Sequence, residues 1–197
     1  MTVNTATPDY IVDGVLTDGE SWVPLSSTVV SGTSTATITM ESTTGVNDWS
    51  QYMDLVLIWY AKIIDASSGA NSIRMKFNTS SSDFLTQSLL SNGSSGYADQ
   101  GAYPQLGYAP VDTPADVFSA GKITLGDINS GKYKAWQGQM SAVAFPASYY
   151  GYVSDTVGVW QQTAPLTQID LHEGNNYNFV AGSRFDLFGV LPRMVTV

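Results

Sequence analysis

The chain has 197 residues, with 17 acidic side chains against 8 basic ones and a formal charge of −9. This charge has the wrong sign for binding phosphate backbones or anionic lipid, so we expect no nucleic-acid partner and no membrane partner. Cysteine is absent, which excludes disulfides and thiolate chemistry. The chain shows no run of roughly 18 apolar residues that would span a membrane, and we expect no secretory signal.

The length suits a single domain with one sizeable core. Charged residues make up only 13% of the chain, so its polarity comes mainly from hydroxyl and amide side chains. We expect residues 26–190 to form the domain. Residues 1–25 are interpreted as an N-terminal arm and first strand, and residues 191–197 as a C-terminal tail.

Strands are predicted wherever apolar and polar side chains alternate, because successive side chains of a strand point to opposite faces. Residues 33–40 (TSTATITM) and residues 71–78 (NSIRMKFN) show this pattern. Residues 53–64 (MDLVLIWYAKII) are apolar on both faces, which indicates a central strand. Further strands are predicted at residues 133–145, 151–160, 166–171 and 183–190.

One short helix is predicted at residues 113–118 (TPADVF). Thr113 would cap it, Pro114 would take its first position and Asp116 would complete a capping box. The remaining pattern is entirely of strands separated by turns rich in Gly, Pro and Asn. The predicted fold class is therefore all-β, an antiparallel, jelly-roll-like β-sandwich with at most this one helix.

Candidates for catalysis are few. His172 is the only histidine, and its place at a strand end favours a structural or solvent-facing role. Asp155 and Asp170, on neighbouring predicted strands, could form a glycosidase pair, but such a pair needs a raised pKa in a cleft. Asp127 and Asn129 match part of a calcium loop without its glycine and glutamate spacing, which favours a polar turn. We expect no enzyme, no metal and no cofactor.

Aromatic residues are the one class in surplus, at 12% of the chain. Tyr149, Tyr150 and Tyr152 could offer stacking faces to sugar rings, or could fill a core or a subunit interface, where tyrosine is enriched. The second alternative is favoured. Trp160 poses the same choice, and its place at the end of an alternating strand favours a structural anchor.

Residues 158–171 (GVWQQTAPLTQIDL) and the closing residues 182–190 (GSRFDLFGV) resemble a motif of tailed-bacteriophage virion proteins. The resemblance extends upstream in the same order and covers about residues 49–190. Its upstream motifs are YMDLVLIWYAKI, SIRMKFN, LLSNGSSG, YPQLGYAP and ADVFSAGKITLGDINSGKYKAW. Gln161 and Gln162 depart from an Arg-Asn pair that is common in such proteins, and Phe188 departs from a common Tyr.

This resemblance implies a structural protein on the outside of a virion, made in the host cytoplasm. We expect a decoration (cement) protein that binds the outer surface of a phage head and stabilises it. Its expected partners are the major capsid protein and itself, as a homotrimer, with residues 1–10 as an arm that orders on contact. The alternative is a tail-fibre or receptor-binding module that recognises host surface glycan through Tyr149, Tyr150 and Tyr152.

Overall fold

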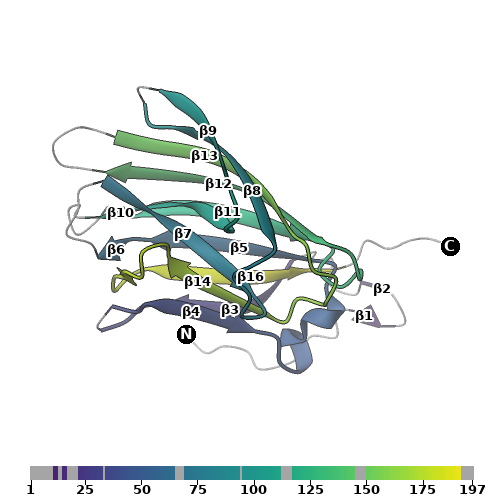
Figure 1. Cartoon of the computed structure of the whole chain (residues 1–197). Helices are drawn as coiled ribbons and strands as arrows, with labels where there is room; N and C mark the ends of the chain where they lie inside the picture. The colour runs from purple at the N-terminus through teal and green to yellow at the C-terminus, as the bar shows by residue number, and fades with distance from the viewer. Residues whose placement is uncertain are drawn as a thin grey trace.

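The computed structural model is an almost entirely β structure (Figure 1). It describes residues 11–12, 15–16, 22–32, 34–64, 69–93, 95–111, 117–144 and 150–191. The only helical segments in these ranges are two 3-10 turns, η1 (Gly45–Asn47) and η2 (Trp49–Gln51). The helix predicted at residues 113–118 lies outside the described residues except for its last two positions, as do residues 1–10 of the expected arm and residues 192–197 of the tail.

The described strands form two main antiparallel sheets and two small ones. The eight-stranded sheet has the order β3 (Trp22–Val29), β16 (Arg184–Val190), β5 (Asp54–Ala61), β11 (Ser119–Gly126), β12 (Lys134–Ala144), β13 (Tyr150–Trp160), β8 (Phe84–Ser91), β9 (Gly96–Gly101). The four-stranded sheet has the order β10 (Gln105–Val111), β7 (Gly69–Phe77), β14 (Gln168–Glu173), β4 (Thr37–Glu41). The small sheets pair β1 (Ile11–Val12) with β2 (Val15–Leu16) and β6 (Ile63–Ile64) with β15 (Asn178–Phe179).

Eight of these strands follow a jelly-roll path. These strands are, in chain order, β3, β4, β5, β7, β10, β11, β14 and β16. When they are numbered one to eight, one sheet has the order 1-8-3-6 and the other has the order 5-4-7-2. The chain crosses from sheet to sheet at every step but one, as it does in a double-sheet jelly roll. The all-β, jelly-roll-like sandwich expected from the sequence is confirmed.

Two hairpins extend one sheet of this jelly roll. The first, β8 and β9, lies in the chain between β7 and β10, and the second, β12 and β13, lies between β11 and β14. Because β12 pairs with β11 and β8 pairs with β13, both hairpins add to the same edge. Figure 1 shows these four added strands in the upper part of the molecule.

The core lies between the two sheets. The alternation predicted for residues 71–78 is confirmed, since Ile73, Met75 and Phe77 of β7 are all fully buried. The central position predicted for residues 53–64 is also confirmed, because β5 is flanked by β16 and β11. Its Val56 is only 1% exposed although it points away from the sandwich interior.

Candidate functional site

The structure does not offer Tyr152 as an exposed platform. Its side chain is half-buried, and its ring stacks on Tyr108 of β10, with centroids 5.5 Å apart and an interplanar angle of 24°. Because β10 belongs to the opposite sheet, Tyr152 points into the sandwich, as the core alternative predicts. Tyr149 and the side chain of Tyr150 lie outside the described residues.

Trp160 lies in the core at the end of β13 and is 3% exposed. Its ring meets Phe77 edge-on at 5.5 Å and stacks on Phe84 at 6.1 Å. This position ties the end of β13 to β7 of the facing sheet and leaves no ring face for a sugar. The two glutamines that follow contact Asp83 of the same chain, Gln161 through its backbone N–H (2.8 Å) and Gln162 through its side-chain amide (2.8 Å).

The prediction that Asp155 and Asp170 lie on neighbouring strands was wrong. Asp155 lies on β13 of the eight-stranded sheet, whereas Asp170 lies on β14 of the four-stranded sheet. Both point away from the sandwich interior, so they are on opposite sides of the molecule. Asp170 accepts hydrogen bonds from Thr39 (2.7 Å) and Gln168 (2.9 and 3.0 Å), which ties it into the surface of its own sheet.

His172 is a half-buried residue on the outward side of β14. Its Nδ1 lies 2.9 Å from the backbone oxygen of Glu173, and Arg74 is its cross-strand neighbour. Burial is the main cause that lowers the pKa of His172. The hydrogen bond to Glu173 acts in the opposite direction, and the charges of Lys76 and Arg74 lower the pKa further. His172 is therefore fixed in its strand by these contacts. Among the described contacts of His172, none is with a nucleophile.

Asp127 and Asn129 form the turn between β11 and β12. The Asn129 side chain donates to the backbone oxygens of Trp49 (2.8 Å) and Tyr52 (3.0 Å), and the backbone N–H of Asp127 donates to Asp54 (2.7 Å). These hydrogen bonds hold the turn against η2 and the start of β5. Within the described residues, no group of three or more His, Cys, Asp or Glu side chains is arranged to hold a metal ion.

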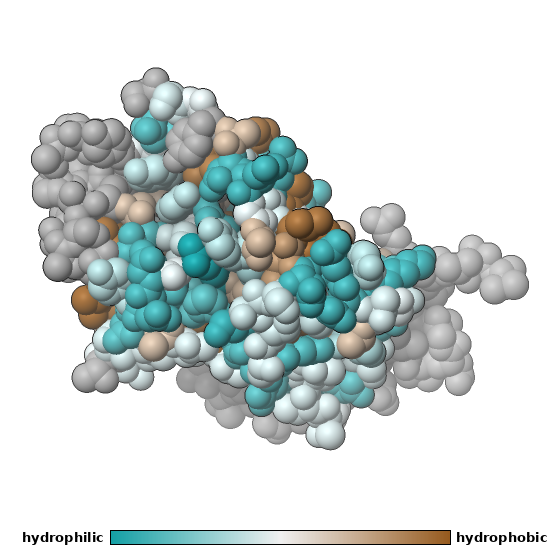
Figure 2. Space-filling view, viewed as in Figure 1, coloured by the Kyte–Doolittle hydropathy of each residue, from teal (hydrophilic) through white to brown (hydrophobic). Residues whose placement is uncertain are grey.

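The most distinctive surface of the molecule is the outward side of the five strands β11, β12, β13, β8 and β9, here called the outer face. Four large apolar side chains are more than half exposed on it. They are Leu89 (62%), Val153 (61%), Leu85 (54%) and Val157 (51%). Figure 2 views the molecule from the opposite side, that of the four-stranded sheet, and shows mostly hydrophilic and neutral colours over β4 and β14.

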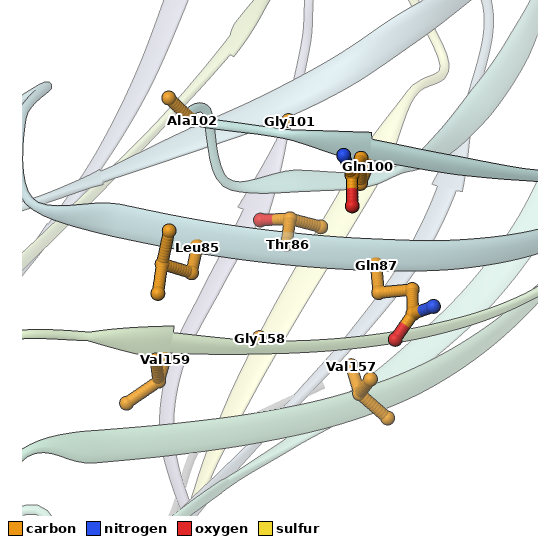
Figure 3. Close-up of a pocket in the computed structure, with 9 residues that line it drawn as sticks. All are labelled: Leu85, Thr86, Gln87, Gln100, Gly101, Ala102, Val157, Gly158 and Val159. Atoms are coloured by element: carbon orange, nitrogen blue, oxygen red, sulfur yellow. The ribbon is translucent and has the colours of Figure 1, made fainter.

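An open hollow of about 640 Å³ lies at one end of this face, across β13, β8 and β9. Its wall includes the outward side chains of Leu85, Gln87, Val157 and Val159, together with Gln100 at its β9 edge. Figure 3 shows Leu85 and Gln87 on one strand, beside Val157 and Val159 on the next. The hollow is therefore mainly apolar, with glutamine amides at its margin. It is called the apolar hollow below.

A smaller depression of about 360 Å³ adjoins the apolar hollow and shares Val157 with it. Its side chains are mostly polar. They come from Lys122 and Thr124 of β11, Gln137 and Gln139 of β12, and Asp155 of β13. Apolar and polar groups thus share one broad surface, in which Lys122 and Asp155 are charged.

Sequence reasoning missed the outer face because it identified neither β8 nor β9 as a strand. The signal was present in residues 84–91 (FLTQSLLS). Leu85 and Leu89 lie on the outward side of this strand with polar residues between them, and Phe84 and Leu90 lie on the inward side.

Comparisons with protein-family models, curated proteins and solved structures find no match to this chain. No helix in the described ranges is long and apolar enough to cross a membrane. The geometry of the outer face is therefore the main guide to function.

Proposed function

We propose that this chain is a structural protein of the outer surface of a phage particle, a decoration protein that binds the shell and stabilises it. The observation that carries the proposal is the outer face, where exposed apolar side chains lie among glutamines on one sheet. Exposed apolar patches on a soluble protein mark contact sites, and interface cores are depleted of charged residues.

The fold supports this proposal. A jelly roll is used by viral capsid proteins, although lectins and cupins use it too, so the fold by itself does not decide function. The resemblance of residues 49–190 to phage virion proteins favours the viral use. The charge of −9 fits a protein on the outside of a shell, because packaged DNA would repel it.

The arrangement of polar groups favours binding over catalysis. The acids Asp155 and Asp170 point away from each other on different sheets, and His172 is held by a backbone oxygen. The apolar hollow is lined mainly by aliphatic and amide groups, and the adjoining depression by amides, a hydroxyl and the charged side chains of Lys122 and Asp155. Such surfaces suit contact with another protein.

The test is the copy number of this chain relative to the major shell protein in purified particles, measured by quantitative mass spectrometry. We expect a ratio close to that of the shell protein. We also expect particles stripped of the chain to lose their contents at a lower temperature, and purified chain to restore the higher temperature when it is added back. A few copies per particle would contradict a decoration role.

The alternative, a tail-fibre module that recognises host glycan, has less support. Of the three tyrosines that suggested it, Tyr152 is packed on Tyr108 inside the sandwich. A low copy number, together with glycan binding that Tyr150→Ala abolishes at an unchanged melting temperature, would favour this alternative.

A further inference from the structure

The outer face carries a charge pattern that is complementary to itself. Lys122 of β11 is the cross-strand neighbour of Gln139 of β12, which in turn is the neighbour of Asp155 of β13. Adjacent strands lie about 4.8 Å apart, so the backbones of Lys122 and Asp155 are separated by about 10 Å. No ion pair joins them, and the one ion pair in the described ranges is between Arg184 and Asp186.

We propose that two copies of this chain pack face to face through the outer face, related by a twofold axis that runs along β12. Such an axis places Lys122 of each copy opposite Asp155 of the other. Gln137 and Gln139 then face themselves across the axis, and an amide can both donate to and accept from its own copy. A glutamine row on the axis is therefore compatible with a symmetric contact.

The shape of the molecule fits the same axis. Trp22, on β3, is 39% exposed, and its ring lies 6.0 Å from that of Phe188 on β16, with the Lys122 ammonium 4.9 Å from the Trp22 ring centre. These contacts place the indole on the outward side of the sheet. The apolar hollow lies on the other side of β12.

One cross-strand row connects the tryptophan to the hollow. From β16 to β9 this row is Phe188, Val56, Thr124, Gln137, Val157, Gln87, Gln100. Gln137 is its midpoint, and Phe188 and Gln100 are each three strands away. Rotation about β12 therefore places Phe188 of one copy opposite Gln100 of the other. The Trp22 ring adjoins Phe188, and Gln100 lies at the edge of the apolar hollow, so the ring comes to lie over the hollow of the partner.

Charge and size favour a second copy as the occupant. The outward positions of β11, β12, β13, β8 and β9 carry one cation, Lys122, and one anion, Asp155, in a chain of charge −9. The outward positions of β5 and β16, which a seven-strand contact also covers, add Asp54 and the Arg184–Asp186 ion pair, so two copies meet through a surface of low net charge. Seven strands at about 4.8 Å and eight residues at about 3.3 Å give on the order of 900 Å² per copy, near the roughly 800 Å² per partner of a stable interface. The inference rests on the premise of the proposed function that the outer face contacts protein, and it names a second copy as that protein; it is measured on the isolated chain.

The experiment is a charge exchange followed by sedimentation and native mass spectrometry. We expect wild-type chain to have the mass of two copies at micromolar concentration. Lys122→Asp and Asp155→Lys should each weaken pairing at least about tenfold, because each places two like-charged pairs across the axis. An equimolar mixture of the two variants should pair again, as heterodimers, because each copy then presents the charge that the other requires.

Shape is tested with a matched pair of substitutions. Leu85→Glu, in the wall of the apolar hollow, should abolish pairing. Ile64→Glu should leave it unchanged, because Ile64 has nearly the same exposure (51% against 54%) but lies on β6, outside the eight-stranded sheet. Circular dichroism should show unchanged melting for both variants.

Three results would overturn the pairing. They are a wild-type chain that stays monomeric, a mixture of charge variants that fails to form heterodimers, and a mass of three copies, which would favour the homotrimer expected from the sequence. A monomer in solution that is nevertheless abundant on particles would refute the pairing and leave the proposed function standing.

Discussion

The indole ring of Trp136 lies against the backbone of Gly158, its cross-strand neighbour in the β12–β13 hairpin. A Cβ atom on Gly158 would lie only 2.0 Å from Cζ2 of Trp136. Trp59 and Gly121 repeat this relationship on β5 and β11, also at 2.0 Å. In both pairs the ring fits flat on the sheet only because the opposing residue has no side chain.

Gly158→Ala is expected to destabilise the protein by about 1–3 kcal/mol, because the added methyl overpacks a full core and displaces the Trp136 ring. Urea unfolding followed by tryptophan fluorescence measures the loss. Gly151→Ala, on the same strand, is the control, since a Cβ there meets nothing closer than a backbone oxygen at 3.9 Å. Equal stability of the two variants would contradict the packing explanation.

Trp160→Ala is expected to cost about 3–5 kcal/mol, the usual loss for truncating a buried tryptophan. This is a large part of the roughly 5–15 kcal/mol that holds a domain together, so the variant should be partly or wholly unfolded by circular dichroism. Tyr133→Ala serves as a control at a 55% exposed site. A Trp160→Ala variant of normal stability that had lost only affinity for glycan would refute the anchor role.

The lowered pKa of His172 predicts a loss of stability in mild acid. The folded chain holds His172 neutral to a lower pH than the unfolded chain, whose histidine titrates near the ordinary value of 6.5. The unfolded state therefore binds more protons below about pH 6.5, and stability falls as the pH drops through this range. His172→Gln should show a smaller fall between about pH 7.5 and about pH 5.5 in urea unfolding. An identical fall in both proteins would show that other groups cause it.

Glu173 holds the turn that follows β14. The side chain is fully buried, and its Oε2 accepts hydrogen bonds from the backbone N–H groups of Asn175 (2.6 Å) and Tyr177 (3.0 Å). Glu173→Ala should cost about 1–3 kcal/mol, because these two donors lose their acceptor. Glu173→Gln keeps an acceptor oxygen and should cost less. Thermal melts of the two variants compare them directly, and equal losses would mean that the carboxyl group does more than accept these bonds.

The alternation of apolar and polar residues was enough to predict the fold class and the inward faces of the regular strands. Alternating residues such as Ile73, Met75 and Phe77 specify a buried face because successive side chains of a strand point in opposite directions. The same reasoning favoured the core for Trp160, where the structure places it.

Which strands are neighbours became clear from the folded chain alone. Alternation tells which side chains share a face, but not to which sheet a strand belongs, because pairing depends on contacts between residues far apart in the chain. Asp155 and Asp170 were predicted to lie on neighbouring strands because their strands follow each other in the sequence. The chain nevertheless changes sheets between them. The outer face arises in the same way. In the sequence, 58 residues separate the end of β8 (Ser91) from the start of β13 (Tyr150), yet the two strands pair along eight positions.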